Sequence, residues 1–207
     1  MENKSYSKSL LVGAAFFILA LVINYFASMY AAERVSHPVT DIILSNVPVK
    51  NVNQIIIYTT LVLLIIGLRA LIKNPKMIPY VLKSLALFIV IRAVFITLTH
   101  LGPFAPQLAL SSNLIASVGL GGAGDLFFSG HTGMPFLLAL VFWEHKPLRV
   151  VFLAGSLILG VSVLLGHLHY SIDVLAAYFI TYTIFHLSKI FFADDWNLFN
   201  SKPLKEH

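Results

Sequence analysis

The feature that most constrains the fold of this chain is a series of six long apolar runs. They cover roughly residues 10–31, 55–72, 80–98, 133–143, 148–166 and 172–192. A helix needs about 20 mostly apolar residues to cross a bilayer, so the fourth run is long enough only if it begins near Phe127. Charged residues make up 11% of the chain, against about 25% in soluble domains. The sequence therefore predicts an all-α integral membrane protein, a six-transmembrane-helix bundle forming a single membrane domain over residues 1–207.

The basic residues predict the orientation of this bundle, because Lys and Arg concentrate on the cytoplasmic side of membrane proteins. With a cytoplasmic N-terminus, only Arg34 and Lys50 lie outside, and Arg92 falls within the third run. The remaining basic residues are then cytoplasmic: Lys4, Lys8, Arg69, Lys73, Lys76, Lys83, Lys146, Arg149, Lys189, Lys202 and Lys205. We expect both termini to be cytoplasmic. The first run resembles a signal peptide in its flanks, but it exceeds the usual 7–15 apolar residues, so a retained span is predicted.

The first polar island separates the fifth and sixth runs. It contains His167, His169 and Asp173, in the stretch Gly-His-Leu-His-Tyr-Ser-Ile-Asp. If a helix begins at or just before His169, this histidine and Asp173 lie one turn apart, within hydrogen-bonding reach. A carboxylate bound to one ring nitrogen fixes the tautomer and makes the other nitrogen a better nucleophile or base.

The second polar island lies about forty residues earlier, where Ser129, Gly130, His131 and Thr132 precede an apolar run. Such a stretch predicts a helix N-terminus, whose backbone N–H groups and dipole favour a bound anion. The loop before it, residues 99–128, has no Lys or Arg and includes a glycine cluster at 119–124. Both islands are predicted to lie on the outer face. We expect the fold to bring His131 face to face with the His169 and Asp173 pair.

These residue types together indicate phosphoryl transfer. Arg92 can bind a phosphate bidentately, and the helix start can cradle it. In this hypothesis His169 attacks phosphorus and Asp173 orients it, while His131 acts as general acid and then as base. The predicted substrate-binding residues are Arg92, Asp125, Ser129, Gly130, Thr132, Tyr170 and His167. No cofactor and no metal ion is expected, because the Ser-Gly-His stretch and Arg92 fit a phosphate better than a metal.

The same residues carry a family resemblance. Residues 125–132 read Asp-Leu-Phe-Phe-Ser-Gly-His-Thr, and residues 169–178 read His-Tyr-Ser-Ile-Asp-Val-Leu-Ala-Ala-Tyr. This pair resembles the two signature motifs of the sphingomyelin synthase family, within the type 2 phosphatidic acid phosphatase superfamily. Residues 92–97 and 99–103 are similar, more loosely, to a third motif. The resemblance covers about residues 92–192, and it implies a metal-independent six-helix bundle with His131, His169 and Asp173 as its catalytic triad.

The sequence also departs from its relatives. Ala123 stands where sphingomyelin synthases often have Cys, and the N-terminal interaction domain and long tail of animal members are missing, so we expect a compact bacterial form. Lipid phosphatases carry a Lys and an Arg-Pro pair in their first motif and an Arg six residues before the nucleophilic His. Here that motif is absent, and Val163 holds the last position. Because a phosphodiester has one charge fewer than a monoester, fewer cations suffice, which favours headgroup transfer over monoester hydrolysis.

The resulting functional hypothesis is a multi-pass enzyme of a bacterial inner membrane, with its site on the extracytoplasmic face. It would move phosphocholine or phosphoethanolamine from a glycerophospholipid donor to a lipid alcohol acceptor, ceramide or diacylglycerol, through a phosphohistidine. The first alternative is a lipid phosphatase or phospholipase C-like hydrolase with the same triad. The second is a non-catalytic lipid-binding or transport protein. The basic residues are scattered, so nucleic acid is not an expected partner.

Each candidate residue has a structural explanation as well. His169 and Asp173 would then be a pair at a helix start, and His131 a neighbour of a helix cap. Arg92 would extend to the membrane interface. The alternatives are evenly balanced for His167, between substrate contact and a structural role. Asp125 either shapes the headgroup pocket or caps the helix that follows.

Overall fold

The structure, a computed structural model, describes residues 2–108 and 126–200, and every regular element in this part is helical. The elements are α1 (Glu2–Glu33), α2 (Asn53–Lys73), the 3₁₀ turn η1 (Pro75–Met77), α3 (Ile78–Leu98), α5 (Gly130–Val141), α6 (Lys146–Leu165), α7 (Ser171–Phe191) and α8 (Ala193–Asn200). The prediction of an all-α protein is confirmed, and several of its helices are candidate membrane spans.

Among the described residues, five helical segments are long and apolar enough to cross a membrane: α1, α2, η1 with α3, α6 and α7. The sixth, α5, has 12 residues. At 1.5 Å per residue it is about 18 Å long, against about 30 Å for the apolar layer. The extension of this helix toward Phe127 is corrected, because the chain turns into the helix only at Gly130, after the N-cap residue Ser129. The number of crossings stays a prediction.

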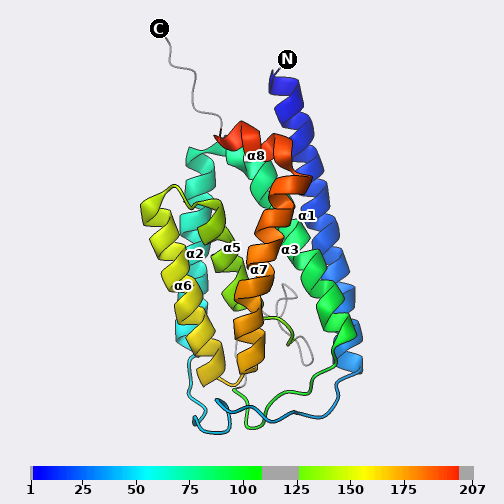
Figure 1. Cartoon of the computed structure of the whole chain (residues 1–207), viewed down its shortest axis with the longest axis vertical. Helices are drawn as coiled ribbons and strands as arrows, with labels where there is room; N and C mark the ends of the chain where they lie inside the picture. Colours follow the sequence, from blue (N-terminus) through cyan, green and yellow to red (C-terminus); the bar gives the residue numbers. More distant parts are fainter. Residues whose placement is uncertain (1, 109–125, 201–207) are drawn as a thin grey trace.

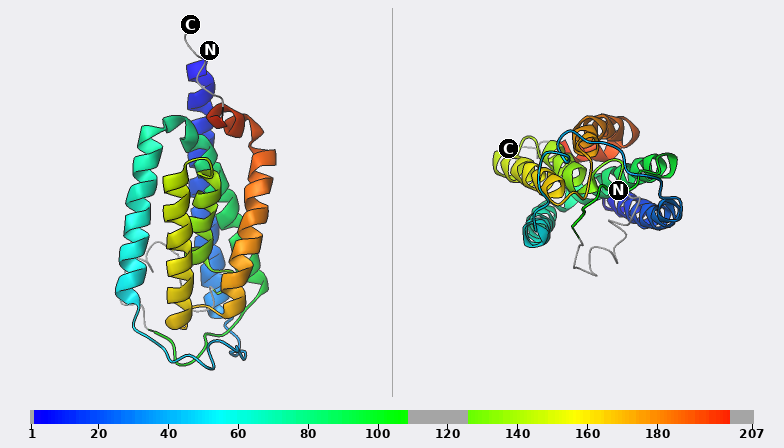
Figure 2. Two further views of the ribbon diagram at one scale, coloured as in Figure 1. Left: turned by 60° about the vertical axis from the view of Figure 1, so that its left-hand side comes forward. Right: turned by 90° about the horizontal axis from the view of Figure 1, so that it is seen from below.

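The short helix α5 lies at the centre of the bundle (Figures 1 and 2). It packs mainly against α6 and α7 and also contacts α3 and α2, while α1 runs along α3. Small residues allow the close approaches, as is usual between membrane helices. A Cβ at Gly133 of α5 would lie 2.7 Å from Phe88 of α3, and one at Gly155 of α6 would lie 2.7 Å from Leu63 Cδ2 of α2.

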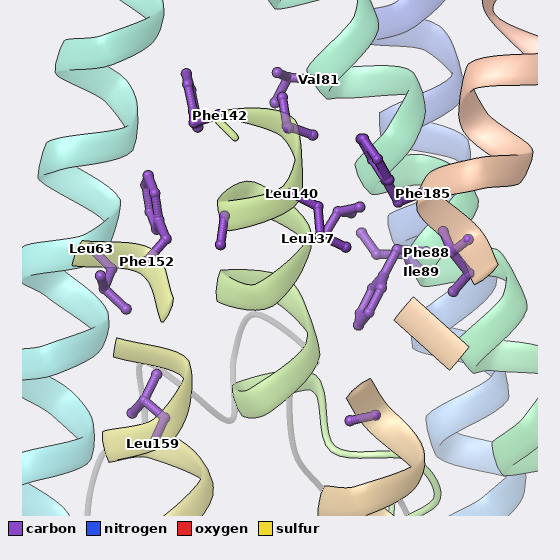
Figure 3. Close-up of a cluster of buried hydrophobic side chains, with 14 of the residues drawn as sticks. Leu63, Val81, Phe88, Ile89, Leu137, Leu140, Phe142, Phe152, Leu159 and Phe185 are labelled. Carbon is purple, nitrogen blue, oxygen red and sulfur yellow. The ribbon is translucent and has the colours of Figure 1, made fainter. Parts of the chain in front are cut away.

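The core is centred on the same helix. Leu137 and Leu140 of α5 lie among Phe88 and Ile89 of α3 and Phe185 of α7 (Figure 3). These side chains are almost fully buried. In contrast, α1 and α2 expose many large apolar side chains, as expected for surfaces that face lipid.

The two ends of the bundle differ. The start of α1, the α2–α3 turn, the α5–α6 turn and α8 lie at one end, and the connections 34–52 and 99–108 lie at the other (Figure 1). The first turns of α7 and α5 face this second end. Both histidine motifs therefore share the end that holds Arg34 and Lys50. The side of the membrane to which this end belongs, and hence the position of the termini, stays a prediction.

A buried ion pair ties the opposite end together. Lys83 Nζ of α3 lies 2.5 Å from Asp195 Oδ2 of α8 and donates a 2.8 Å hydrogen bond to Ser9 Oγ of α1. The Ser9 hydroxyl also donates to Asp195. This cluster joins three helices at the end of the bundle farthest from the histidine motifs.

Candidate active site

The connection between α6 and α7 positions His169 and Asp173. Asp173 lies in the first turn of α7, and its Oδ2 accepts a 2.9 Å hydrogen bond from the backbone N–H of Tyr170, the N-cap residue. A carboxylate in this position satisfies an otherwise unpaired N–H group at the helix start. The side chain of Asp173 is completely buried. One role of Asp173 is therefore to begin the helix immediately after His169.

The hydrogen bond expected between His169 and Asp173 is corrected by the structure. His169 Nδ1 lies 2.8 Å from the carbonyl oxygen of Leu126 and 3.6 Å from Asp173 Oδ2. The Leu126 carbonyl oxygen is therefore the hydrogen-bond partner of Nδ1, because it is the nearer of the two oxygens. A carbonyl oxygen can only accept, so the neutral ring carries its proton on Nδ1 and leaves the lone pair on Nε2. Asp173 remains within ion-pair distance of the ring.

The start of α5 brings the second motif to the same place. Ser129 is the N-cap, and its Oγ accepts hydrogen bonds from the Thr132 N–H and the Thr132 hydroxyl, at 3.4 and 3.2 Å. The Ser129 N–H donates to the carbonyl oxygen of Asp173 at 3.2 Å, which joins the starts of α5 and α7 directly. Gly130 and His131 follow and are half-buried.

The two histidines of these motifs face each other. The ring centroids of His131 and His169 are 6.3 Å apart, with the ring planes at 65°. The expectation that the fold brings these residues together therefore agrees with the geometry. His169 is 6% exposed, whereas His131 is only half-buried.

Arg92 of α3 adds a buried cation beside the start of α5. Its side chain is 3% exposed, and Nε donates a 2.8 Å hydrogen bond to the carbonyl oxygen of Phe128. A Cβ at Gly130 would lie 3.4 Å from Arg92 Nε. The guanidinium therefore lies against Gly130, the first residue of a helix whose dipole favours anions. Arg92 and the start of α5 thus place a cation and the positive end of a helix dipole side by side.

Two predicted substrate-binding residues make hydrogen bonds to backbone groups in the connections 34–52 and 99–108. His167, with φ of 53°, has Nδ1 and Nε2 each 2.9 Å from a carbonyl oxygen, those of Pro106 and Val47. The Tyr170 hydroxyl donates to Gly102 O at 2.7 Å and accepts from the Val39 N–H at 3.1 Å. Burial raises the pKa of Tyr170, so the hydroxyl stays a donor at neutral pH. A substrate contact by either residue stays a prediction.

The other predicted residues are less informative. Thr132 is fully buried, and a Cβ at Gly160 of α6 would lie 3.3 Å from its hydroxyl oxygen. Its side chain therefore packs toward α6 while it supports Ser129. Asp125 and the glycine cluster at 119–124 lie outside the described residues. Within residues 2–108 and 126–200, no group of three or more His, Cys, Asp or Glu side chains is arranged to hold a metal ion.

Sequence reasoning missed two groups that hold the site. One is the Leu126 carbonyl, because a backbone acceptor leaves no mark on the sequence. The other is Asp41, an acidic residue in the connection between α1 and α2. Its Oδ1 accepts from the N–H groups of Ile43 and Leu44 at 2.8 and 3.0 Å, and its Oδ2 accepts from the N–H and hydroxyl of Ser171 at 2.7 and 2.8 Å. The only available signal was a carboxylate in a loop with few charges.

Comparison with known proteins agrees with this geometry. Residues 122–190 match the model of the family described as PAP2 superfamily C-terminal, and this region contains both histidine motifs. The match supports the type 2 phosphatidic acid phosphatase superfamily. It suggests lipid activity of the phosphatase or phosphotransferase type, and with the apolar helices it fits a multi-pass membrane protein.

A search for similar proteins found a short match to a curated protein and no matching solved structure. An uncharacterized protein of Methanocaldococcus jannaschii is 34% identical over 59 residues, which are 28% of this chain and 25% of that protein. The similarity thus spans a quarter of the relative's length. No solved structure matches the chain.

Proposed function

We propose that this protein is a membrane lipid phosphotransferase that moves a phospho-headgroup from a glycerophospholipid to a lipid alcohol through a phosphohistidine. The observation that carries the proposal is the pairing of His131 and His169, 6.3 Å apart, beside Arg92 and the start of α5. Two histidines can act on opposite sides of one phosphoryl group, one as nucleophile and one as acid and base. A buried arginine and a helix start stabilise the charge on its oxygens.

The first half of the reaction uses the tautomer imposed by Leu126. Nε2 of His169 attacks phosphorus with its lone pair, the bond from phosphorus to the diacylglycerol oxygen breaks, and protonated His131 gives its proton to that oxygen. The ring of His169 becomes positively charged, and Asp173, 3.6 Å from Nδ1, stabilises this charge. Asp173 thus acts through its charge, whereas the Leu126 carbonyl orients the ring.

The second half returns the enzyme to its starting state. The acceptor hydroxyl gives its proton to His131 and attacks phosphorus. The bond from phosphorus to Nε2 breaks, and its electron pair returns to the ring. The proposed acceptor is ceramide or diacylglycerol, and the proposed headgroup is phosphocholine or phosphoethanolamine. Val163 is fully buried in α6, at the position where phosphatases carry an arginine, which supports a diester rather than a monoester substrate.

The test uses the purified protein in detergent with phosphatidylcholine or phosphatidylethanolamine and a fluorescent ceramide or diacylglycerol. Products are separated by thin-layer chromatography. We expect the fluorescent acceptor to gain a headgroup with the wild type and with His145→Ala, which changes an exposed histidine at the opposite end. His169→Ala and His131→Ala should lose this activity, the latter by roughly 10²- to 10⁴-fold.

Other outcomes would contradict the proposal in distinct ways. Consumption of the donor without modification of the acceptor would identify a hydrolase with the same triad. No change in any lipid, or full activity of His169→Ala, would favour a lipid-binding or transport protein. Acid-labile label on a peptide containing His169, after incubation with a headgroup-labelled donor alone, would support the covalent intermediate.

A further inference from the structure

The outer end of the bundle is closed by two connections that pack together, residues 34–52 and 99–108, called the outer cap below. The Ser36 N–H donates to the His100 carbonyl oxygen at 2.9 Å, and the Gly102 N–H donates to that of His37 at 3.3 Å. Leu44 of the cap is 2% exposed and forms a buried cluster with Leu126 and Tyr170. The cap therefore covers the residue whose carbonyl holds His169.

Asp41 fastens the outer cap to the start of α7. Its Oδ1 accepts the N–H groups of Ile43 and Leu44, which shapes the cap itself. Its Oδ2 accepts the N–H and hydroxyl of Ser171, two residues after His169. Four donors thus converge on one buried carboxylate. Asparagine has the same shape but would turn an N–H₂ group toward two of these donors, so only a carboxylate satisfies all four.

The cap lies at the end of the bundle that the first turns of α5 and α7 face (Figure 1). His169 is 6% exposed, Arg92 is 3% exposed and Asp173 is fully buried. Water is the main competitor of a lipid alcohol for a phosphohistidine, because both offer a hydroxyl and follow the same route. In each case oxygen bonds to phosphorus, the bond from phosphorus to Nε2 breaks, and the hydroxyl proton passes to His131. Access to the site therefore decides which acceptor reacts.

We propose that Asp41 is a positioning residue that determines acceptor specificity. Its hydrogen bonds to Ser171 hold the outer cap in place, and the cap keeps water away from phosphorylated His169. This proposal rests on the proposed function for its reaction, but the effect of these hydrogen bonds on access to His169 can be tested without turnover. When they are lost, the cap opens locally, and both water and small aqueous reagents reach His169.

The first experiment measures access to His169 directly. The full-length protein in detergent is treated with diethyl pyrocarbonate at neutral pH, and the modification rate of each histidine is read by peptide mass spectrometry. We expect Asp41→Asn to raise the rate at His169 about tenfold, as for a buried group freed by local opening. The rates at the exposed His145 and His186 should not change. Asp194→Asn, an exposed carboxylate on α8, is the matched control.

The second experiment measures acceptor choice. Wild type and Asp41→Asn react with phosphatidylcholine and fluorescent ceramide, and the ratio of headgroup transferred to headgroup released into water is determined. We expect this ratio to fall about tenfold in the variant while the donor is still consumed. Ser171→Ala loses the hydrogen bond from the hydroxyl to Asp41 but keeps the one from the backbone N–H, so we expect a smaller fall in this ratio. This variant replaces Asp41→Asn if Asp41→Asn does not fold.

The outcomes separate this proposal from the proposed function. The proposal is overturned if Asp41→Asn leaves the modification rate of His169 unchanged. It is also overturned if the variant unfolds at a lower temperature but keeps the wild-type ratio of transferred to released headgroup, because Asp41 would then be merely structural. If the wild type consumes no lipid donor, the proposed function fails, and the modification rates still show whether Asp41 protects His169.

Discussion

At the residue scale, the chemistry of the candidate site depends on which atom accepts the hydrogen bond from Nδ1 of His169. A histidine near an aspartate suggests a hydrogen-bonded pair, yet the acceptor of His169 Nδ1 is the Leu126 carbonyl. A carbonyl cannot take up the proton, so the tautomer is imposed without a proton being lost to the partner. Asp173 is then left to cap α7 and to provide negative charge at 3.6 Å.

This separation of roles predicts the effect of Asp173→Asn. The amide oxygen can still accept the Tyr170 N–H, so α7 should begin normally and the melting temperature should change little. In the proposed mechanism this variant loses the charge that stabilises the ring of His169 during phosphorylation, and we expect kcat for headgroup transfer to fall by roughly 100-fold, with a smaller change in KM. Asp194→Asn serves as control. Unchanged kcat would show that the charge of Asp173 does not act on His169.

A pH dependence follows from Asp41. Burial raises the pKa of Asp41, but the hydrogen bonds from Leu44, Ser171 and Ile43 outweigh burial and bring it below the ordinary 3.8. The folded state therefore favours the carboxylate form of Asp41. The contribution of Asp41 to the stability of the fold is complete above pH 3.8 and is lost as the pH falls through the lowered pKa.

The measurement is the melting temperature of wild type and Asp41→Asn in detergent as a function of pH. We expect the wild type to be more stable by a constant difference between about pH 5 and pH 7, and the difference to shrink below about pH 4. A difference that grows on acidification would mean that the carboxylate is not stabilised by these hydrogen bonds.

At the scale of elements, the central position of α5 depends on a residue without a side chain. Gly133 lies where α5 meets α3 and α7, and a Cβ there would lie 2.7 Å from Phe88 Cε2 and 2.8 Å from Thr181 Oγ1. Since Ser129, Gly130 and His131 precede it in the same helix and its cap, any displacement of α5 moves the site.

We therefore expect Gly133→Ala to destabilise the protein by about 1–3 kcal/mol, because the methyl group overpacks the contact. Activity should fall as well, since His131 shifts relative to His169. Gly67→Ala in α2 is the matched control: its Cβ would lie 3.6 Å from Phe152 Cζ, an ordinary contact. Alanine favours helix over glycine by about 1 kcal/mol, so this variant should be neutral or more stable. Thermal unfolding in detergent would compare the two, and equal melting temperatures would contradict the close packing of α5.

At the scale of the whole molecule, the bundle is held differently at its two ends. The end that holds the histidine motifs is tied by hydrogen bonds to backbone groups, whereas the opposite end contains the ion pair of Lys83 and Asp195 with Ser9. Both charged side chains are largely buried. Removal of one partner leaves a buried charge, which usually costs about 3–5 kcal/mol.

Asp195→Leu should therefore lower the melting temperature strongly, while Lys83→Met together with Asp195→Leu should recover most of the loss. Thermal unfolding in detergent provides the measurement. Headgroup transfer below the melting temperature should be unaffected in both variants, because the pair lies at the end opposite to the site. If the double variant is as unstable as Asp195→Leu alone, the loss of stability does not come from the unpaired charge of Lys83, and the ion pair itself stabilises the fold.

The sequence by itself determined that the chain is helical with long apolar segments, and it identified the two histidine motifs that form the candidate site. Apolar runs of about 20 residues predict membrane helices because the bilayer has a fixed thickness, and the described helices follow five of these runs closely. The Ser-Gly-His-Thr stretch predicted the start of α5, because N-cap geometry is encoded locally. The two motifs also predicted that His131 and His169 would meet.

Only the tertiary structure decided what holds these residues. The partner of His169 is a carbonyl 43 residues away, and the partner of Ser171 is a carboxylate 130 residues away. Sequence spacing reports neighbours on one helix, whereas backbone acceptors and loop contacts depend on how separate segments pack. For the same reason the sequence did not reveal that His167 and Tyr170 form hydrogen bonds to backbone groups of the outer cap, because the spacing of residues along one helix does not encode contacts with a distant connection.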